Sequence, residues 1–346
     1  MSSADDRATL VSVARAAGVS RQTVSNALHA PAKVAPETLE RVLAAVEELG
    51  YRPSLAARQL RTNRSRTLGL RLEHWGGGIS GSVLDRFLHA LVDEAQGRGY
   101  RVVLFTADDD AGEVARYDEL LSTGQIDGFV LTSTHHGDER TAWLLQRGVP
   151  FATFGRPWPS PGSRREVPLD HCWVDVDGAA GTRAATEHLL AAGHDAPAYL
   201  GWPDGSGTGE DRRRGWAHAL ADAGVAPGRA VELQVPDSTA AALEAVAAAL
   251  TAADREAPTA LVCASDSLAL GARGAASRLG RPLEVIGFDD TPVADAIGVS
   301  SVAQPLGEAA TLAVDLLLAQ VEAGPEGPPP PRQHLLVPRL VLRGTP

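Results

Sequence analysis

The sequence predicts a small all-α head, residues 1–52, and an α/β body, residues 67–346, made of two doubly wound parallel-sheet subdomains. Three observations predict this fold class. Capped segments with helical apolar spacing fill the head. Strand-like and helix-like segments alternate through the body, which indicates parallel sheets with helices on both faces. A body of about 280 residues is large enough for two such sheets.

The head begins with two short expected helices and a tight turn. Apolar residues recur at helical spacing in the first helix: Leu10, Val13, Ala14 and Ala17. Thr9 can cap its start, and Gly18 can end it because glycine tolerates the left-handed conformation. Ser20 can cap the second helix. That helix has its own buried stripe, which comprises Val24, Ala27 and Leu28.

A third expected helix has Pro36 in its first turn and Gly50 at its end. Its core stripe comprises Leu39, Val42, Leu43, Val46 and Leu49. Three short helices with a tight turn between the first two are typical of a helix-turn-helix, whose second helix enters the major groove of DNA. A plain three-helix packing module with a polar face is the alternative, and it is disfavoured because spacing, caps and polar face agree.

The distribution of charge favours a polyanionic partner for the head. The formal net charge of the chain is −11 at pH 7, yet residues 1–66 contain ten Arg or Lys against six Asp or Glu. A basic head on an acidic body indicates nucleic acid binding at one end of the chain. Charge alone leaves a solvated cluster of surface helices open as an interpretation.

The polar face of the second expected helix carries groups that can contact DNA. This face shows Arg21, Gln22, Ser25, Asn26 and His29. Gln22 can form two hydrogen bonds with adenine, and Arg21 can do so with guanine. Short hydroxyl donors suit phosphate oxygens, which fix the register without reading sequence. These donors are Thr9, Ser20, Thr23 and Ser25.

Residues 53–66 are expected to form a hinge helix and linker. Pro53 can start a helix, but a helix this short is unstable alone in water. We expect it to order where two copies meet over DNA, with Leu60 wedged into the minor groove. A plain interdomain linker is the alternative interpretation.

Two stretches within residues 9–66, VARAAGVSRQTVSNAL and VAPETLERVLAAVEELGYRPSLAARQL, carry a family resemblance. They closely resemble the head and hinge of the LacI/GalR transcriptional regulators, and the resemblance continues through nearly the whole chain. It implies that Arg21, Gln22 and Asn26 read bases and that Leu60 opens the centre of the operator. The full set of expected DNA-binding residues is Thr9, Ser20, Arg21, Gln22, Thr23, Ser25, Asn26, His29, Tyr51 and Leu60.

Two positions depart from the family pattern in the head. Relatives often carry Arg where Asn26 stands and Asn where His29 stands. The operator sequence of the relatives therefore does not carry over, and we expect a different base preference at the position that Asn26 faces.

The body alternates expected strands with expected helices. Strand-like runs begin at Thr67, Tyr100, Ile126, Val149, Trp173, Ala196, Ala260 and Leu283, and a last strand is expected in LLVPRLVLR. Helical stretches include 81–97, 178–193, 210–223, 238–253 and 266–279. The resemblance implies two periplasmic-binding-protein-like subdomains, with chain crossings near 163–166, 290–297 and 322–330. The first subdomain would comprise about 67–163 and 291–323, and the second about 164–290 and 324–346.

The resemblance implies an effector in the cleft between the subdomains, outside the carboxyl ends of the strands. The expected effector-binding residues are Asp289, Arg212, Arg156, Trp202, Ser265, Trp158 and Trp75. Carboxylates, arginines and tryptophans suit a sugar, which offers hydroxyls and an apolar face. GFDD and RRRGW match ligand motifs of the family, which favours Asp289 and Arg212, although these two could simply pair with each other. Gly155 and Ser265 stand where sugar-binding relatives often have Asp and Asn, so the effector stays open.

Other classes of protein find less support. No stretch approaches the roughly 18 apolar residues of a membrane span, and the polar start MSSADDRATL has no apolar signal segment. Cys172 and Cys263 form no CxxC or His/Cys ligand pattern, which argues against a disulfide scaffold or a zinc site. The pairs His135–His136 and His171–Cys172 have no third ligand at metal spacing. No GxSxG, HExxH or phosphate-binding loop indicates an enzyme.

The sequence therefore predicts a cytoplasmic homodimeric repressor with no catalytic residues, cofactor, metal or membrane partner. It would bind a palindromic double-stranded DNA operator and leave it when a small-molecule effector, a mono- or oligosaccharide, enters the cleft. One alternative is a cytosolic or exported sugar-binding protein without regulatory DNA binding. Another is a co-repressor-dependent regulator that senses a purine or another metabolite.

Overall fold

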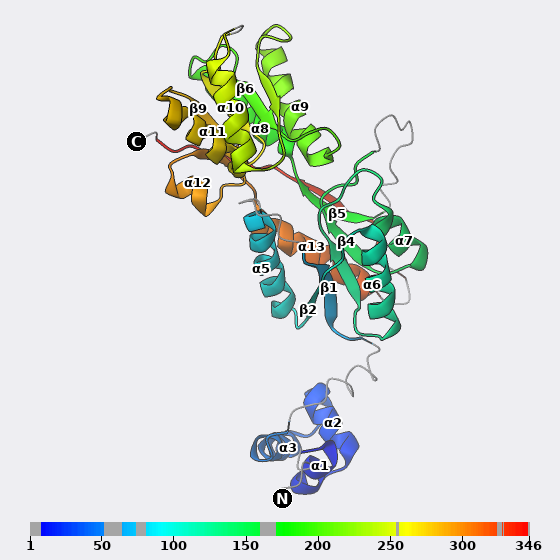
Figure 1. Cartoon of the computed structure of the whole chain (residues 1–346). Coiled ribbons are helices and arrows are strands. Elements are labelled where there is room, and N and C mark those ends of the chain that lie inside the picture. The colour runs from blue at the N-terminus through cyan, green and yellow to red at the C-terminus, as the bar shows by residue number, and fades with distance from the viewer. Residues whose placement is uncertain are drawn as a thin grey trace, which may run out of the picture. The chain divides into compact units, whose positions relative to one another are not determined.

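The structure is a computed structural model, and its described residues are 8–51, 64–73, 81–159, 171–253, 256–323, 327 and 329–344. The chain divides into two compact units, Met1–Ser65 and Arg66–Pro346. Figure 1 shows a purely helical first unit and a second unit that contains both helices and strands. Among the described residues, no helix combines the length and the apolar character that a membrane crossing requires.

The first unit contains the three expected helices. They are α1 (Leu10–Ala17), α2 (Arg21–His29) and α3 (Pro36–Glu48), with a short 3-10 helix at Pro31–Lys33. Thr9 and Ser12 cap α1 reciprocally, and Gly18 ends it with a φ of 64°. Ser20 caps α2 by accepting a hydrogen bond from the backbone of Thr23. These caps satisfy backbone groups that a helix end leaves unpaired, and so they fix the turn between the two helices.

The core of the head matches most of the expected apolar stripes. Buried residues from all three helices form one cluster: Val13, Ala14, Ala17, Val24, Ala27, Val42, Ala45 and Tyr51. Leu43 and Leu49 were expected in this core, but 48% and 37% of their surfaces are exposed. Their spacing fits the helical period, yet α3 packs through a narrower stripe than the sequence pattern indicated.

The second unit contains two six-stranded sheets, which confirms the predicted doubly wound body. The first sheet has the order β11-β5-β4-β3-β1-β2, and all its pairs are parallel. Its strands are β1 (Thr67–Arg71), β2 (Arg101–Phe105), β3 (Gly128–Leu131), β4 (Phe151–Phe154), β5 (Cys172–Val176) and β11 (Gln333–Leu336). We call this sheet with its helices the first lobe. Those helices are α5 (Gly81–Gly97), α6 (Asp110–Ser122), α7 (Glu139–Arg147) and α13 (Leu306–Val321).

The second lobe is built on a sheet with the order β12-β10-β9-β8-β6-β7. Its strands are β6 (Ala198–Gly201), β7 (Glu232–Gln234), β8 (Ala260–Cys263), β9 (Glu284–Phe288), β10 (Ser300–Ala303) and β12 (Arg339–Val341). Only the edge pair of β10 and β12 is antiparallel among the described pairs. The helices of this lobe are α8 (Gly178–Ala191), α9 (Gly207–Asp222), α10 (Thr239–Thr251), α11 (Asp266–Leu279) and α12 (Pro292–Ala296).

Alternating residues of the first sheet pack on opposite faces, as the pleat requires. Val130 of β3 belongs to a cluster with residues of α5 and α13. Its neighbours Phe129 and Leu131 belong to another cluster, with Tyr117 of α6 and Leu144 of α7. The central strand β3 is therefore buried on both faces of the sheet, which leaves the ends of such strands for a ligand.

The strand pairing corrects the expected subdomain boundaries. A strand belongs to the sheet with which it shares hydrogen bonds, and β5 pairs with β4 and β11. The first crossing between lobes thus follows Val176 instead of lying near 163–166. Similarly, β10 pairs with β9, so the second crossing follows Ala303 instead of lying near 290–297.

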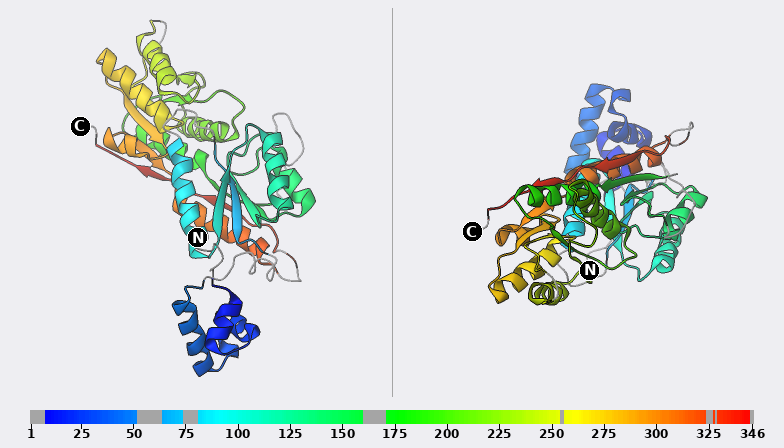
Figure 2. Two further views of the ribbon diagram at one scale, coloured as in Figure 1. Left: turned by 60° about the horizontal axis from the view of Figure 1, so that its bottom comes forward. Right: turned by 90° about the horizontal axis from the view of Figure 1, so that it is seen from above.

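The third crossing also differs from the expectation near 322–330. LLVPRLVLR was expected to form one strand, but it forms β11 in the first sheet and β12 in the second. Pro338 separates the two strands, and a proline cannot donate a hydrogen bond to a sheet. The red strands at the end of the chain accordingly pass from one lobe to the other in Figures 1 and 2.

Candidate functional site

A cavity of about 320 Å³ lies between the lobes, at the carboxyl ends of strands from both sheets. Its apolar lining consists of Val83, Leu84, Phe154, Val176 and Trp202. Its uncharged polar lining consists of Ser133, Thr134, Ser206, Thr208 and Gln304. Asp175, Arg212 and Asp289 supply the charges. An apolar pocket with a few convergent polar groups is the usual form of a small-molecule site.

Arg212 and Asp289 form the charged centre of this cleft. Arg212 Nη1 lies 3.6 Å from Asp289 Oδ1, and each side chain is less than a tenth exposed. Gln304 donates a hydrogen bond from Nε2 to the same carboxylate oxygen over 2.7 Å. Burial raises the pKa of Asp289 to about 7, against the opposing attraction of Arg212. This pair confirms that the two motif residues lie together, and it also shows the mutual pairing that the sequence left open.

The Arg212 guanidinium lies close to two aromatic rings. Its carbon lies 3.7 Å from the ring centre of Phe288 and 5.3 Å from that of Trp202. Arg212 Nη1 also donates to the backbone oxygen of Ala264 over 2.5 Å. By contrast, Arg212 Nε and Trp202 Nε1 are buried and have no hydrogen-bond partner within the described chain. Buried donors without partners are costly, and a ligand or water in the cleft would supply partners for these two.

Asp289 has an unusual backbone conformation. Its φ is 111°, and the φ of the following Asp290 is 50°. Residues other than glycine rarely adopt positive φ values, and such strain gathers at functional sites. The carbonyl groups of both residues accept hydrogen bonds from Arg86 of α5, in the opposite lobe, over 3.2 and 3.1 Å.

Three of the expected effector residues do not line the cavity. Ser265 is fully buried, where it caps α11 and donates to Asp237 Oδ1 over 2.5 Å. Trp158 packs so closely on the first residue of α9 that a Cβ on Gly207 would meet its ring at 2.2 Å. Arg156 forms ion pairs with Asp175 and Asp211 at the edge of the cleft. Trp75 lies outside the described residues.

The departure at Gly155 has a visible reason in the structure. Gly155 lines the cleft with a φ of 120°, and an added Cβ would meet Thr134 Oγ1 at 2.3 Å. A side chain at this position would displace the Thr134 hydroxyl. The absence of a side chain at Gly155 therefore leaves room for the Thr134 hydroxyl in the wall of the cleft.

Several cleft residues were absent from the sequence-based expectation. Ser133 and Thr134 follow β3, and Gln304 follows β10, so their position after strands was the available signal. The strand β10 was itself not predicted, which hid Gln304. Asp175 lies within β5, where alternation alone does not say which face carries a ligand.

The head places the expected base-reading residues Arg21, Gln22 and Asn26 on one helix, α2. Arg21 and Gln22 are exposed at the start of α2. Gln22 Nε2 donates to Asn26 Oδ1 over 3.0 Å, one turn further along this helix. Tyr51 was expected at the DNA surface, but only 8% of its surface is exposed, and it belongs to the core of the head. Leu60 and the side chain of His29 lie outside the described part of the chain.

The hydroxyl groups expected at phosphates are partly engaged within the head. Ser20 Oγ lies 2.9 Å from Thr23 Oγ1 and accepts from the Thr23 backbone over 3.0 Å. Thr9 Oγ1 accepts from the Ser12 backbone over 3.2 Å. Accepting a hydrogen bond leaves a hydroxyl proton free to donate, so a capping role and a phosphate contact are compatible.

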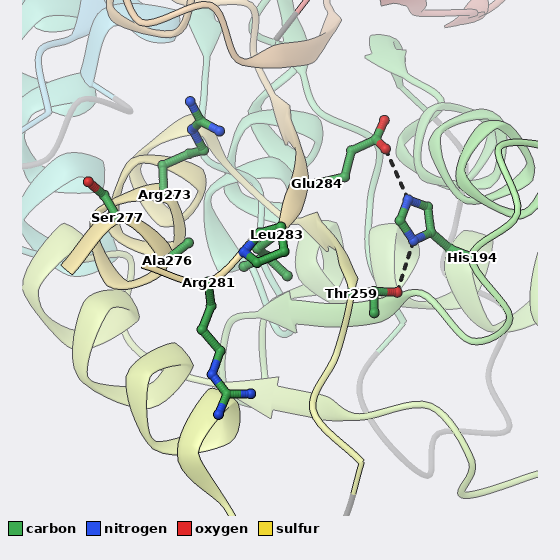
Figure 3. A pocket seen from close by; sticks show the side chains of 9 residues that line it. His194, Thr259, Arg273, Ala276, Ser277, Arg281, Leu283 and Glu284 are labelled. Atoms are coloured by element: carbon green, nitrogen blue, oxygen red, sulfur yellow. Dashed lines mark hydrogen bonds and ion pairs between the residues drawn. The ribbon is translucent and has the colours of Figure 1, made fainter. Parts of the chain in front are cut away.

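A larger cavity, of about 620 Å³, lies elsewhere in the second lobe (Figure 3). His194 stands at its wall between Thr259 and Glu284, with 2.9 Å to each. Thr259 and Glu284 lie at the amino ends of β8 and β9. Ligands of open α/β sheets bind at the carboxyl ends of strands, so the smaller cavity between the lobes is the better candidate.

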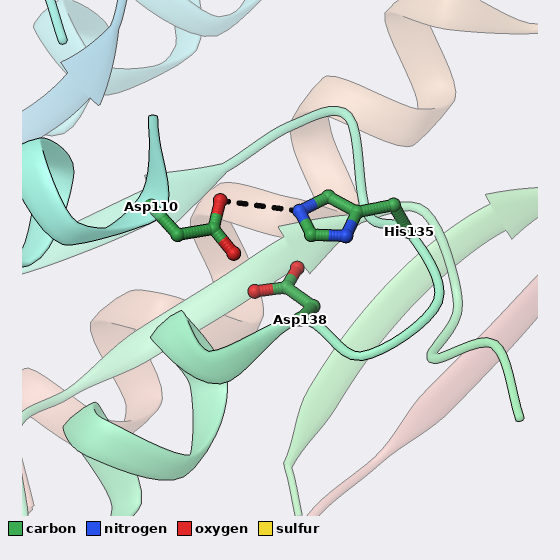
Figure 4. Close-up of side chains that lie close together, drawn as sticks. All are labelled: Asp110, His135 and Asp138. Atoms are coloured by element: carbon green, nitrogen blue, oxygen red, sulfur yellow. Dashed lines mark hydrogen bonds and ion pairs between the residues drawn. The ribbon is translucent and has the colours of Figure 1, made fainter. Parts of the chain in front are cut away.

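The first lobe also contains a cluster of potential metal ligands (Figure 4). Ligand atoms of Asp110, His135 and Asp138 lie within 4.8 Å of one another. The spacing of residues in the sequence did not indicate these neighbours of His135, because the starts of α6 and α7, which are distant in the chain, bring the two carboxylates beside it. However, the buried Arg140 donates to both oxygens of Asp138 over 2.9 and 2.7 Å and lies 3.7 Å from Asp110. These carboxylates already have a cationic partner, and we assign no metal to them.

Comparison with known proteins identifies the family. Residues 9–54 match the model for bacterial regulatory proteins of the lacI family, and residues 186–345 match a periplasmic binding protein-like domain. The HTH-type transcriptional regulator CelR of Thermobifida fusca is 32% identical over 295 residues, which cover 84% of each chain. The chain belongs to the LacI family. This LacI-family protein is a DNA-binding transcriptional regulator.

Solved structures of LacI-family proteins share its architecture. A complex of the transcriptional regulator CelR with cellobiose is 27% identical, with a TM-score of 0.68, and the match covers 98% of this chain and 100% of that one. The lac repressor dimer bound to its operator and the anti-inducer ONPF is 25% identical, with a TM-score of 0.79 and coverage of 98% and 99%. These matches span both units of the LacI-family chain.

Proposed function

We propose that this protein is a cytoplasmic repressor that leaves a palindromic operator when a small uncharged sugar binds between its lobes. The observation that carries this proposal is the cleft itself. It combines a buried carboxylate and guanidinium with two buried donors, Arg212 Nε and Trp202 Nε1, that have no partner within the described chain. No catalytic step is part of the proposal.

The chemistry of the cleft favours a polyhydroxylated ligand. A sugar hydroxyl can donate to the Asp289 carboxylate and accept from Arg212 Nε, while Trp202 offers a flat apolar surface. Each charge that lines the cleft already has an opposite charge beside it. Arg212 faces Asp289, and Arg156 faces Asp175. A phosphorylated or acidic ligand would bring a negative charge for which the cleft has no unpaired cation. An uncharged sugar therefore fits better.

The size of the cavity limits the ligand. Its volume of about 320 Å³ lies near the lower end of ligand pockets, which span roughly 300–1,000 Å³. A mono- or disaccharide therefore suits it. The solved CelR complex holds cellobiose, which supports a small carbohydrate as the class of effector.

DNA recognition is assigned to α2 of the head. Arg21, Gln22 and Asn26 would face base edges in the major groove, while Thr9, Ser20, Thr23 and Ser25 would contact phosphates. Two heads of a homodimer would read the two halves of an inverted repeat, since operator symmetry mirrors protein symmetry. The lac repressor structure, a dimer on its operator, supports this arrangement. Leu60 is proposed to enter the minor groove at the dyad.

The proposed switch acts through the orientation of the two lobes. A ligand shifts an equilibrium only by the difference between its affinities for the two states. Asp289 binds Arg86 of the other lobe through its carbonyl group and lines the cleft with its carboxylate. A sugar that prefers one lobe arrangement would thus change the spacing of the hinge segments and weaken operator binding.

The test combines two measurements on the full-length protein. A thermal-shift screen with mono- and disaccharides, their phosphates and nucleobases should show stabilisation by an uncharged sugar alone, because a ligand that binds the native state raises Tm. Fluorescence anisotropy with DNA beside the protein's own gene should then show release by that sugar. Binding of a nucleobase that strengthens DNA binding would instead establish a co-repressor mechanism.

A further inference from the structure

Arg156 joins the two lobes at one edge of the cleft. It follows β4 of the first lobe, and its Nε lies 2.5 Å from Asp175 Oδ2 on β5 of the same lobe. Its Nη2 lies 3.1 Å from Asp211 Oδ2 on α9 of the second lobe. One guanidinium therefore spans two carboxylates that belong to different lobes.

The three side chains are shielded from water. The side chains of Arg156, Asp175 and Asp211 are 18%, 15% and 2% exposed. Screening by salt is weak for charges in such a setting, and separating the lobes would remove one of the two carboxylate partners of Arg156. Opening the lobes at this edge would leave Asp211 with the backbone N–H of Ala179 and with Arg214, both in its own lobe.

Further contacts between the lobes occur at the same edge. The Arg156 guanidinium lies 4.9 Å from the ring centre of Trp158, which in turn packs on Gly207 at the start of α9. His136 Nε2 of the first lobe lies 3.3 Å from Glu210 Oε2 of α9. The first turns of α9 thus contact several groups of the first lobe, and Arg156 forms an ion pair with this helix.

This edge is also part of the effector site. Asp175 lines the cleft, and so do Ser206, Thr208 and Arg212 of α9. A ligand hydroxyl that donates to Asp175 would compete with Arg156 for the same carboxylate. The Asp175 carboxylate is therefore shared. It affects both the position of α9 against the first lobe and the binding of a ligand in the cleft.

We propose that Arg156 is an ionic bridge that holds the two lobes in this arrangement and thereby sets the operator affinity of the effector-free protein. It acts as a positioning residue for Asp175 and α9 and does not itself line the cleft. The link to operator affinity rests on the proposed function, whereas the bridge between lobes does not.

The bridge is tested by a distance measurement between the lobes, without DNA or effector. Spin labels are placed at Glu119→Cys on α6 and Glu244→Cys on α10, two exposed positions in different lobes. The native Cys172 and Cys263 are buried and should stay unlabelled. Labelled chains are mixed with an excess of unlabelled chains, so that each labelled dimer carries one labelled subunit.

Arg156→Met should broaden or shift the distance distribution. The matched control is Arg213→Met, which also removes one arginine charge. Among the described residues, the ion pair of Arg213 is with Glu232, inside the second lobe. Arg213→Met should retain the wild-type distribution. Arg156→Lys keeps the charge but reaches a single carboxylate, so its distance distribution should lie between those of the wild type and Arg156→Met. If Arg156→Met fails to fold, Arg156→Lys tests the bridge in its place. Wild-type distributions for the folded Arg156 variants would overturn the bridge.

The second arm measures binding to a duplex that covers the DNA beside the protein's own gene. Arg156→Met should change its Kd by between about 5-fold and 150-fold relative to Arg213→Met, the usual range of coupling between sites. A changed distance distribution with an unchanged Kd would overturn the link to operator affinity. Failure of the wild-type protein to bind DNA would instead contradict the proposed function, while the distance result would stand.

Discussion

Arg212 and Asp289 meet in the wall of the cleft, with 3.6 Å between guanidinium and carboxylate and with both side chains almost fully buried. This pair alone does not satisfy Arg212, because its Nε has no partner within the described chain. Asp289 is held at a positive φ, and its carboxylate also accepts a hydrogen bond from Gln304. Charged groups held in this way are suited to contact a ligand that completes their hydrogen bonds.

Asp289→Asn is therefore expected to abolish the response to effector while DNA binding persists. The amide keeps the volume of the side chain but removes the charge that faces Arg212, which should weaken effector binding by about 2–5 kcal/mol. Operator release titrated with effector is the measurement. Asp290→Asn is the matched control, since Asp290 pairs with Arg343 over 2.6 Å and does not line the cleft. A wild-type effector response in Asp289→Asn would remove this residue from the site.

Stability should depend on pH through the same carboxyl group. Burial raises the pKa of Asp289 to about 7 in the folded protein, whereas an unfolded Asp has a pKa of about 3.9. Between these values the folded state holds a proton that the unfolded state has lost, so the free energy of unfolding falls as the pH rises from about 4 to about 7. The slope is at most about 1.4 kcal/mol per pH unit.

Denaturant unfolding at several pH values checks this slope. Asp289→Asn does not titrate and should show a flatter profile than the wild type across the same range. Burial also raises the pKa of Asp211 and that of Asp266, and these groups act in the same direction in both proteins. Parallel profiles for wild type and Asp289→Asn would contradict the assignment.

The head and most strands could be predicted because local signals are strong there. Thr9, Gly18 and Ser20 mark helix ends through their own chemistry, and the buried parallel strands are continuous apolar runs. The edge strand β7 was missed because it covers only Glu232–Gln234 and is not fully buried. The lobe boundaries were misplaced because partner choice among strands is a long-range property that no local pattern contains.

The candidate site could be predicted only in part for a related reason. Asp289 and Arg212 stand in recognisable motifs, and the structure brings them together. Arg156 and Ser265 carry the right chemistry in the right region, yet other carboxylates and a helix end take up their polar atoms. Which partner a polar side chain finds depends on packing between elements far apart in the chain, and the sequence does not state it.

Operator discrimination should depend on Gln22. Because Gln22 donates to Asn26, Gln22→Ala removes one of the two amides proposed to read bases and also frees the other to rotate. Specific binding should weaken by about 1–3 kcal/mol, while binding to unrelated duplex DNA should change little. The double variant with Asn26→Ala should lose less than the sum of the two single variants, as coupled neighbours do. Equal losses on specific and unrelated DNA would contradict base reading by this pair.

The close approach of α8 and α9 should make Gly215 sensitive to substitution. A Cβ at this position would meet the backbone oxygen of Ala179 at 2.0 Å and Thr182 Oγ1 at 2.4 Å. Gly215→Ala should therefore destabilise the protein by about 1–3 kcal/mol. Gly97→Ala is the control, because a Cβ there meets nothing within 4 Å at the end of α5. It should be neutral or stabilise by up to about 1 kcal/mol, since alanine loses less entropy in a helix.

The account is tested most directly by operator binding of the full-length protein titrated with the sugar that stabilises it most. Anisotropy with the DNA beside its own gene should show tight binding without sugar, loss of binding with sugar, and retained binding for Asp289→Asn at the same sugar concentration. Two results would contradict the account: the sugar releases Asp289→Asn from the DNA as readily as it releases the wild type, or it releases neither protein. In either case the cleft between the lobes would not control DNA binding by the head.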